Sequence, residues 1–401
     1  MATDIAHTVH PVEAAAVLRL FPAPPRLLAL GEPTHGEDAL LAVRNDLFRQ
    51  LVEQQGYRTI ALESDCLKAL VVDDYVTSGA GGLDEVMERG FAHGWGEHEG
   101  NRELVSWMRE FNAQAEAEGR GEGERVRFAG FDGPLEFTGA ASPREAVLAL
   151  HDWLASRVDA QLMPCERSLL DTLLGADGPW SDPAAMTEPE RSRGRSTEAL
   201  ELRLIVDELT AVLETCAPHL SSAPEELHRA RLHARTATGL LRYHHAMADP
   251  SPARMTRLVA LRDLMMADTV RALRGPALLY GHNGHLQRVR STMRLWQGEV
   301  EWWGAGALVA AHGSGEYGFV ATALGTLRHR GVDAPPPDTV EGLLHAQPRD
   351  HGVVDVPALL AALDGTRPVR RESPWFGYAP LDPAGLHAVD GLVYVRDVGG
   401  R

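Results

Sequence analysis

The chain has 401 residues, of which 44% are hydrophobic, and a formal net charge of -17 at pH 7, a composition typical of a globular protein. Its acidic balance and its lack of basic runs argue against nucleic-acid binding, because phosphate recognition depends on clustered Lys and Arg. No stretch approaches the ~20 consecutive apolar residues of a membrane helix, so no membrane association is predicted.

The N-terminal segment, residues 1–25, has neither the basic start nor the long apolar core of a secretory signal. The three cysteines of the chain are far apart and form no CxxC pair, so neither a disulfide framework nor a thiolate zinc site is indicated. Both observations predict a cytoplasmic protein. The oligomeric state is not indicated by the sequence.

A strand, a helix and a second strand are predicted between residues 26 and 64. The runs "RLLALGE" (26–32) and "YRTIALES" (57–64) are apolar and of strand length. Between them, residues 37–56 carry apolar side chains at helical spacing and end in Gly56. This pattern is typical of a βαβ unit.

The alternation of strands and helices continues along the chain. Further elements are predicted as helices at 67–76, 103–117 and 253–274 and as strands at 125–132, 276–283, 307–313, 318–326 and 391–398. We therefore predict an α/β fold with a mostly parallel central sheet flanked by helices.

Residues 160–248 interrupt this rhythm, because they are helical by composition and contain a polar loop at 175–196. We predict that they form a helical insertion that caps an active-site cleft. The predicted division is a first part of the α/β core at 1–159, the insertion or lid at 160–248, and a second part of the core at 249–401.

Several familiar catalytic signatures are absent from the sequence. There is no GxSxG elbow, no Walker A loop and no HExxH motif. The segment "GSGEYG" (313–318) matches GxGxxG, but a strand-like run follows it where a dinucleotide site requires a helix. Serine-nucleophile, nucleotide-binding and zincin chemistry are therefore not predicted.

Ionisable side chains gather where three predicted strands end, the edge at which open parallel sheets bind ligands. They are Glu32, His35, Arg44, Glu63, His282 and His285. The glutamates end the first two strands, the histidines lie in the loops "GEPTHGE" and "GHNGH", and the arginine lies on the helix that leaves the first loop. That arginine could point back over the site.

This set of residues can activate water. Histidine takes up a proton near neutral pH, and a neighbouring carboxylate orients its ring and stabilises its charged form. Because no Ser or Cys nucleophile is indicated, a water activated by histidine would attack a carbonyl carbon. Arg44 or a second histidine could stabilise the oxyanion that develops.

Each residue also has a purely structural interpretation. A glutamate at a strand end is often a helix cap or an ion-pair member, Arg44 alone would be a solvated helix residue, and "GHNGH" alone would be a turn. Only the combination favours a site. His244 and His245 are predicted to be structural, whereas His93 and His98 lie in a Gly- and Trp-rich loop that could line a cleft.

Five motifs occur in a characteristic order: "GEPTHGEDALLAVRNDLF", "IALES", "FAGFD", "LRDLMMADTV" and "YGHNGHL". In these motifs, which span most of the chain, the sequence resembles the erythromycin esterase family. The resemblance implies an α/β fold in which a helical region encloses a deep cleft. It also implies hydrolysis of a macrolide lactone by water, an antibiotic-resistance activity.

Carried over to this chain, the resemblance implies that His35 is the general base. The other implied catalytic residues are Glu32, Glu63, Arg44, His282 and His285. We also predict that His93, His98, Asp132 and Arg262 bind the substrate. Two positions depart from the expected pattern, since Asp268 stands where asparagine is expected and Gly284 where alanine is expected. These departures concern the substrate more than the fold.

The leading prediction is thus a carboxylic ester hydrolase that opens a cyclic ester without a cofactor, with a small-molecule ester or lactone as its only expected partner. Three alternatives stay open. The glutamates and histidines could hold a divalent metal that activates the water. The same pocket could serve a biosynthetic acyl transfer, cyclisation or hydrolysis. The protein could also bind and sequester a ligand without turnover.

Overall fold

The computed structural model describes residues 5–136, 139–295, 298–313 and 315–399. The chain forms two compact units. The α/β unit consists of Met1–Glu63, Lys68–Gly130 and Val270–Arg401, and the helical unit consists of Ser64–Leu67 and Phe131–Thr269.

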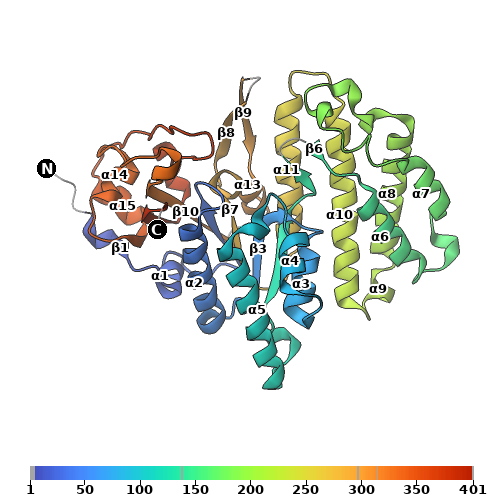
Figure 1. Cartoon of the computed structure of the whole chain (residues 1–401), viewed down its shortest axis with the longest axis horizontal. Helices are drawn as coiled ribbons and strands as arrows, with labels where there is room; N and C mark the ends of the chain where they lie inside the picture. Colours follow the sequence, from blue (N-terminus) through green and yellow to red (C-terminus); the bar gives the residue numbers. More distant parts are fainter. Residues whose placement is uncertain (1–4, 137–138, 296–297, 314, 400–401) are drawn as a thin grey trace. The chain divides into compact units, whose positions relative to one another are not determined.

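Within the described residues, the α/β unit is built on an eight-stranded sheet (Figure 1). In sheet order the strands are β1 (Val9–His10), β11 (His351–Asp355), β12 (Gly391–Asp397), β10 (Tyr317–Thr326), β2 (Leu27–Glu32), β7 (Ala277–His282), β3 (Thr59–Asp65) and β4 (Arg127–Asp132). Neighbours from β12 to β3 run parallel, and β1 and β11 pair antiparallel. The predicted α/β fold with a mostly parallel sheet is therefore confirmed.

The position of β7 determines which residues meet at the sheet edge. β7 lies between β2 and β3 and pairs with both in parallel. Its register sets His282 opposite Glu32, so β2 and β7 end at the same level. The two strands of the predicted βαβ unit are therefore not neighbours, because β7 lies between them.

Helices surround this sheet. They are α1 (Ala14–Leu18), α2 (Asp38–Gln55), α3 (Ala69–Ser78), α4 (Leu83–Arg89), α5 (Glu99–Ala117), α12 (Asn283–Leu286), α13 (Ala305–Ala310), α14 (Val340–His345) and α15 (Val356–Ala362). A separate hairpin is formed by β8 (Arg290–Leu295) and β9 (Gly298–Trp303). Every residue of β2 and β3 is buried, which explains their continuous apolar sequences. α2 is terminated by Gly56, the residue after Gln55, which has a left-handed φ of 73°.

One predicted strand is wrong. The run at 307–313 belongs partly to α13, a helix that follows Gly304. Its alanines and leucine are good helix formers, and Gly306 lets the backbone approach Leu286, whose carbonyl oxygen would lie 1.9 Å from an added Cβ. The strands predicted at 318–326 and 391–398 are present as β10 and β12. A strand thus follows the GxGxxG match, although Ser314 lies outside the described residues.

The helical unit contains α6 (Arg144–Ala155), α7 (Arg167–Leu174), α8 (Thr197–Thr215), α9 (Ala217–Leu220), α10 (Pro224–Met247) and most of α11 (Arg254–Arg271), with a short hairpin of β5 (Leu135–Glu136) and β6 (Gly139–Ala140). Buried leucines of α6 and α8, among them Leu150, Leu154, Leu209 and Leu213, form a core with α10. This unit includes all of residues 160–248. The predicted boundaries and the predicted lid stay predictions.

No described helix has both the length and the apolar character needed to cross a membrane.

Candidate active site

Five of the six predicted catalytic residues lie together at the carboxyl ends of three neighbouring strands of the α/β unit. They are Glu32 at the end of β2, His35 in the following loop, Glu63 in β3, His282 at the end of β7, and His285 in α12. Parallel pairing with β7 in the middle is what brings segments so distant in the sequence to one edge.

His35 is held by a buried carboxylate. Its Nδ1 lies 2.6 Å from Glu32 Oε1, and the hydroxyl of Tyr280 donates a hydrogen bond of 2.6 Å to the other oxygen, Glu32 Oε2. Burial and the neighbouring Glu32 charge raise the pKa of Tyr280 well above its ordinary value, so the phenol stays protonated and remains a donor. Both oxygens of Glu32 are thereby fixed, and the imidazole is oriented with Nε2 pointing away from Glu32.

Glu63 lies between the two other histidines. Its Oε2 accepts a hydrogen bond of 2.7 Å from the backbone N–H of His282. Its Oε1 lies 3.4 Å from His285 Nε2 and 4.0 Å from His35 Nε2. A separation of 4.0 Å is too long for a direct hydrogen bond but suits a bridging water.

Exposure differs sharply among these groups. The side chain of His35 is 42% exposed, whereas those of Glu32 and Glu63 are 1% and 3% exposed and that of His285 is 11% exposed. The buried Trp95 packs beside the His35 ring, with ring centroids 5.5 Å apart. A substrate can therefore reach His35 while the carboxylates stay shielded from bulk water.

His282 is built into the backbone at the end of β7. Its Nδ1 accepts a hydrogen bond of 3.1 Å from Gly284 N–H and so caps α12. Burial, with smaller contributions from the nearby His35 and His285, lowers the pKa of His282 from 6.5 to about 3. The Glu63 carboxylate and a hydrogen bond with the Pro33 backbone only partly oppose this. His282 is thus neutral near pH 7, with its proton on Nε2.

Arg44 is not placed as the sequence predicted. It is fully buried on α2, and its guanidinium donates to Asn45 Oδ1 at 2.7 and 3.0 Å and to Asn101 Oδ1 at 2.8 Å. The same guanidinium lies over the ring of Tyr280, 5.0 Å from its centroid. Arg44 therefore supports Tyr280 from within the core and does not face a substrate.

The two loop histidines proposed for substrate binding have different surroundings. The ring of His98 packs on Gly36, directly after His35, where an added Cβ would lie 2.8 Å from His98 Nε2. Gly36 also has a left-handed φ of 76°, so a larger residue there would be both strained and obstructed. His93 is exposed and has a positive φ of 57°. The structure thus brings His98 to the His35 loop.

The two remaining predicted residues pair with each other in the helical unit. Arg262 Nη2 lies 2.7 Å from Asp132 Oδ2, and its Nε lies 3.2 and 3.1 Å from the two carboxylate oxygens. Their role in substrate binding stays a prediction. His244, interpreted as structural, is buried with its Nε2 2.8 Å from the Ala141 carbonyl oxygen, and burial lowers its pKa to about 4.

Two residues of the "GHNGH" loop have structural tasks. The side-chain amide of Asn283 accepts a hydrogen bond of 3.2 Å from the backbone N–H of Thr322 and donates one of 2.9 Å to the carbonyl oxygen of Thr322. These two bonds connect the loop to β10. Its side chain fills the space above Gly31, where an added Cβ would lie 2.2 Å from Asn283 Oδ1. At Gly284 an added Cβ would lie 3.2 Å from His282 Nδ1. Glycine at position 284, where the family pattern has alanine, therefore avoids a tight contact with the imidazole ring of His282.

Sequence reasoning missed Tyr280, the residue that fixes Glu32. Its only signal was a hydroxyl-bearing side chain inside the apolar run that leads to "GHNGH". Asn45 and Asn101, which hold Arg44, are on two different helices and gave no signal at all.

In the ranges of the chain that the structure describes, no group of three or more His, Cys, Asp or Glu side chains is arranged to hold a metal ion.

Comparisons with known proteins cover most of the chain. The sequence matches the model of the family described as erythromycin esterase over residues 52–398. This span includes Glu63, His282 and His285 and begins after Glu32, His35 and Arg44. No curated protein is significantly similar in sequence.

Solved structures share the fold at low sequence identity. A Bacillus cereus protein has a TM-score of 0.72 and 18% identity, with 99% of this chain and 97% of that chain covered. A succinoglycan biosynthesis protein has a TM-score of 0.64 and 16% identity, with 99% and 96% covered. A histidine-to-asparagine variant of the erythromycin esterase EreC in its open conformation has a TM-score of 0.64 and 18% identity, with 94% and 91% covered.

Proposed function

The chain belongs to the erythromycin esterase family, whose membership supports an ester hydrolase, and we propose that its substrate is a cyclic ester of the macrolide lactone type. One observation carries this proposal. His35 is accessible, is oriented by Glu32 at 2.6 Å, and faces Glu63 across a gap of 4.0 Å. Such an arrangement suits the activation of a water molecule for attack on a carbonyl carbon.

In the proposed reaction His35 acts as the general base. Glu32 accepts a hydrogen bond from Nδ1–H, so the lone pair of the neutral ring lies on Nε2. A water between Nε2 and Glu63 Oε1 would donate a hydrogen bond to each, and its oxygen would attack the ester carbonyl while Nε2 takes up the proton. The imidazolium that forms is stabilised by the buried Glu32 carboxylate.

The second half of the reaction uses the same groups. The Nε2 of His285, 3.4 Å from Glu63 Oε1, is the candidate donor to the oxyanion of the tetrahedral intermediate. Collapse of this intermediate breaks the bond between the carbonyl carbon and the ring oxygen. The imidazolium of His35 then protonates the departing alkoxide. The product is an open-chain hydroxy acid, heavier than the lactone by one water.

Mass spectrometry of a panel of macrolides of different ring size, incubated with the purified protein, tests this proposal. We expect a gain of one water in at least one compound, loss of that gain in His35→Ala, and no effect of a chelator. Turnover by His35→Ala at the wild-type rate would contradict the proposed base. Loss of activity on chelation with recovery on adding a divalent metal would favour metal-assisted attack.

The biosynthetic alternative uses the same pocket and differs in substrate. If no macrolide gains water, the panel should be repeated with acylated sugars and other non-macrolide esters. Turnover of such a compound, dependent on His35, would keep the hydrolytic mechanism and overturn the macrolide assignment. Tight binding of a ligand without product would indicate sequestration.

A further inference from the structure

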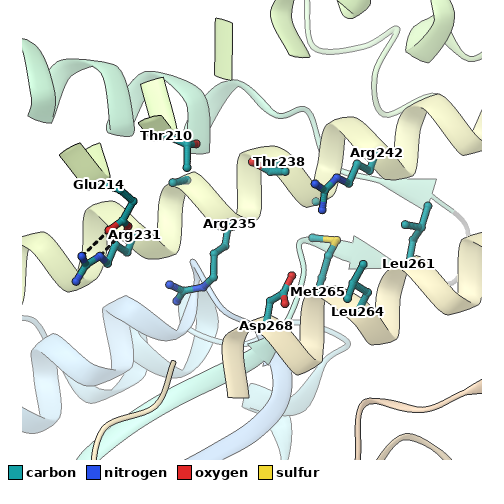
Figure 2. A pocket seen from close by; sticks show the side chains of 12 residues that line it. Thr210, Glu214, Arg231, Arg235, Thr238, Arg242, Leu261, Leu264, Met265 and Asp268 are labelled. Carbon is teal, nitrogen blue, oxygen red and sulfur yellow. Dashed lines mark hydrogen bonds and ion pairs between the residues drawn. The ribbon is translucent and has the colours of Figure 1, made fainter. Parts of the chain in front are cut away.

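The helical unit contains a cavity that the proposed reaction does not use. It has a volume of about 290 Å³, close to the lower end of the ~300–1,000 Å³ typical of ligand pockets. Its walls come from α8, α10 and α11, and none of the proposed catalytic residues lines it. Figure 2 shows the side chains around this space.

The cavity is amphipathic. One wall is apolar and is formed by Leu261, Leu264 and Met265 of α11. The close approach of α10 at Gly239, where an added Cβ would lie 2.5 Å from Met265 Cγ, seals this wall. The facing side of α10 carries three arginines, and Thr238 lies between Arg235 and Arg242 (Figure 2).

The charges lining the cavity do not cancel. Three arginines, Arg231, Arg235 and Arg242, face two carboxylates, Glu214 and Asp268, which leaves one positive charge. Arg231 is already engaged, because its Nε and Nη2 lie 2.9 and 2.6 Å from the two oxygens of Glu214. The remaining excess therefore rests with the other two arginines, opposed by the single carboxylate of Asp268.

Arg235 lines the cavity with a guanidinium whose charge is only partly compensated. Its Nε is buried and makes no hydrogen bond to any residue in the described part of the chain. Burial lowers the pKa of its guanidinium, and the nearby carboxylates of Asp268 and Glu214 counteract this only in part. An anionic ligand in the cavity would compensate the charge of this partly desolvated guanidinium.

We propose that this cavity binds a small monocarboxylate with an apolar body. The carboxylate would accept from Arg235 and from Arg242 at the rim, and the apolar body would lie on Leu261, Leu264 and Met265. Asp268 repels any anion, so a single negative charge matches the excess better than a doubly charged phosphate. The proposal does not depend on the proposed esterase function.

Isothermal titration calorimetry with hexanoate tests this assignment, with hexanamide and inorganic phosphate as comparison ligands. We expect hexanoate to bind, and Arg235→Gln to weaken binding about tenfold or more, the size of a charge-assisted hydrogen bond. Hexanamide and phosphate should bind more weakly than hexanoate. Arg229→Gln removes the same charge from α10 outside the cavity and should bind as the wild type does.

Three results would overturn the proposal: no binding of hexanoate to the wild type, equal binding to Arg235→Gln, or tighter binding of phosphate. His35→Ala serves as a second control and should keep its affinity, because loss there would place hexanoate at the candidate active site. If Arg235→Gln does not fold, Thr238→Leu fills the cavity without touching an arginine and should weaken binding.

Discussion

His35 follows β2 and His282 ends the neighbouring strand β7, and their rings lie 5.3 Å apart. The two differ in what holds Nδ1. In His35 it is a buried carboxylate, Glu32, which prepares the ring to receive a proton on Nε2. In His282 it is the N–H of Gly284, so the ring accepts a backbone hydrogen bond, and burial keeps this ring neutral. The two histidines occupy similar positions at strand ends. The group that Nδ1 contacts therefore distinguishes the proposed general base, His35, from the helix-capping residue, His282.

The largest expected effect concerns the base itself. His35→Ala should lower kcat/KM for the ester that the wild type hydrolyses by about 10²- to 10⁴-fold, the usual contribution of a general base. Because the side chain is 42% exposed, water can replace it beside Glu32 Oε1, and the free energy of unfolding should fall by only about 1 kcal/mol. Steady-state kinetics and urea unfolding measure both. If His35→Ala were active but unstable, His35 would be a structural residue, and its role as general base would be wrong.

The next effect concerns the buried Arg44, which packs on Tyr280, the residue that holds Glu32 beside His35. Arg44→Met keeps most of the volume but leaves the carbonyl oxygens of Asn45 and Asn101 without their donor, at a cost of about 2–3 kcal/mol in unfolding free energy. Arg49→Met, on the same helix and partly exposed, is the matched control and should cost about 1 kcal/mol or less. A stable but inactive Arg44→Met would instead support the sequence-based idea that Arg44 binds the oxyanion.

A smaller effect tests how Glu32 acts on His35. Tyr280→Phe keeps the ring over which Arg44 lies and removes one hydrogen bond to Glu32, so kcat should fall about tenfold. Glu32, held at one oxygen fewer, would position the His35 ring less firmly, so the pH dependence of kcat/KM should shift as well. The pH profile of kcat/KM measures this shift.

A matched variant separates this effect from general loss of packing. Tyr57→Phe also removes a buried hydrogen bond, that of its hydroxyl to the Pro25 carbonyl oxygen, 2.5 Å away. It should lower stability and leave the pH profile unchanged. Equal profiles for Tyr280→Phe and the wild type would show that Tyr280 does not act through Glu32.

The sequence was sufficient for the part of this site that depends on strand ends. Apolar runs that stop at Glu32 and Glu63, and a histidine pair after a third run, predicted the edge of a parallel sheet and the residues on it. The sequence could not predict the strand order, because no local sequence pattern specifies that β7 lies between β2 and β3. The histidine at the end of β7 could therefore not be told apart from the one after β2.

Residues that act through the core were also hidden from the sequence. A buried Arg44 and an exposed one have the same helical spacing, and the difference lies in asparagines contributed by α2 and α5. Likewise, the alanine-rich run at 307–313 became α13 because glycines allow a close approach that only the folded chain defines. Tertiary contacts determine the surroundings of these residues, so patterns of neighbouring residues in the sequence could not predict them.

An effect that is seen only in acid concerns His282 and the stability of the fold. Its pKa is lowered to about 3 from 6.5, so below pH 6.5 the unfolded chain binds a proton that the folded one does not. Stability from this group is full above pH 6.5 and is lost as the pH falls toward 3. His282→Asn keeps a capping oxygen and should reduce the slope of unfolding free energy between pH 6 and 4 by up to about 1.4 kcal/mol per pH unit.

Urea unfolding across this pH range measures that slope. His244→Asn should reduce it in the same sense from the helical unit, because burial lowers the pKa of His244 to about 4. Loss of the slope in His282→Asn with retention of ester hydrolysis would establish that this histidine serves the backbone. An unchanged slope together with lost activity would mean that His282 is charged during the reaction. The distinction drawn from the partners of Nδ1 would then have to be abandoned.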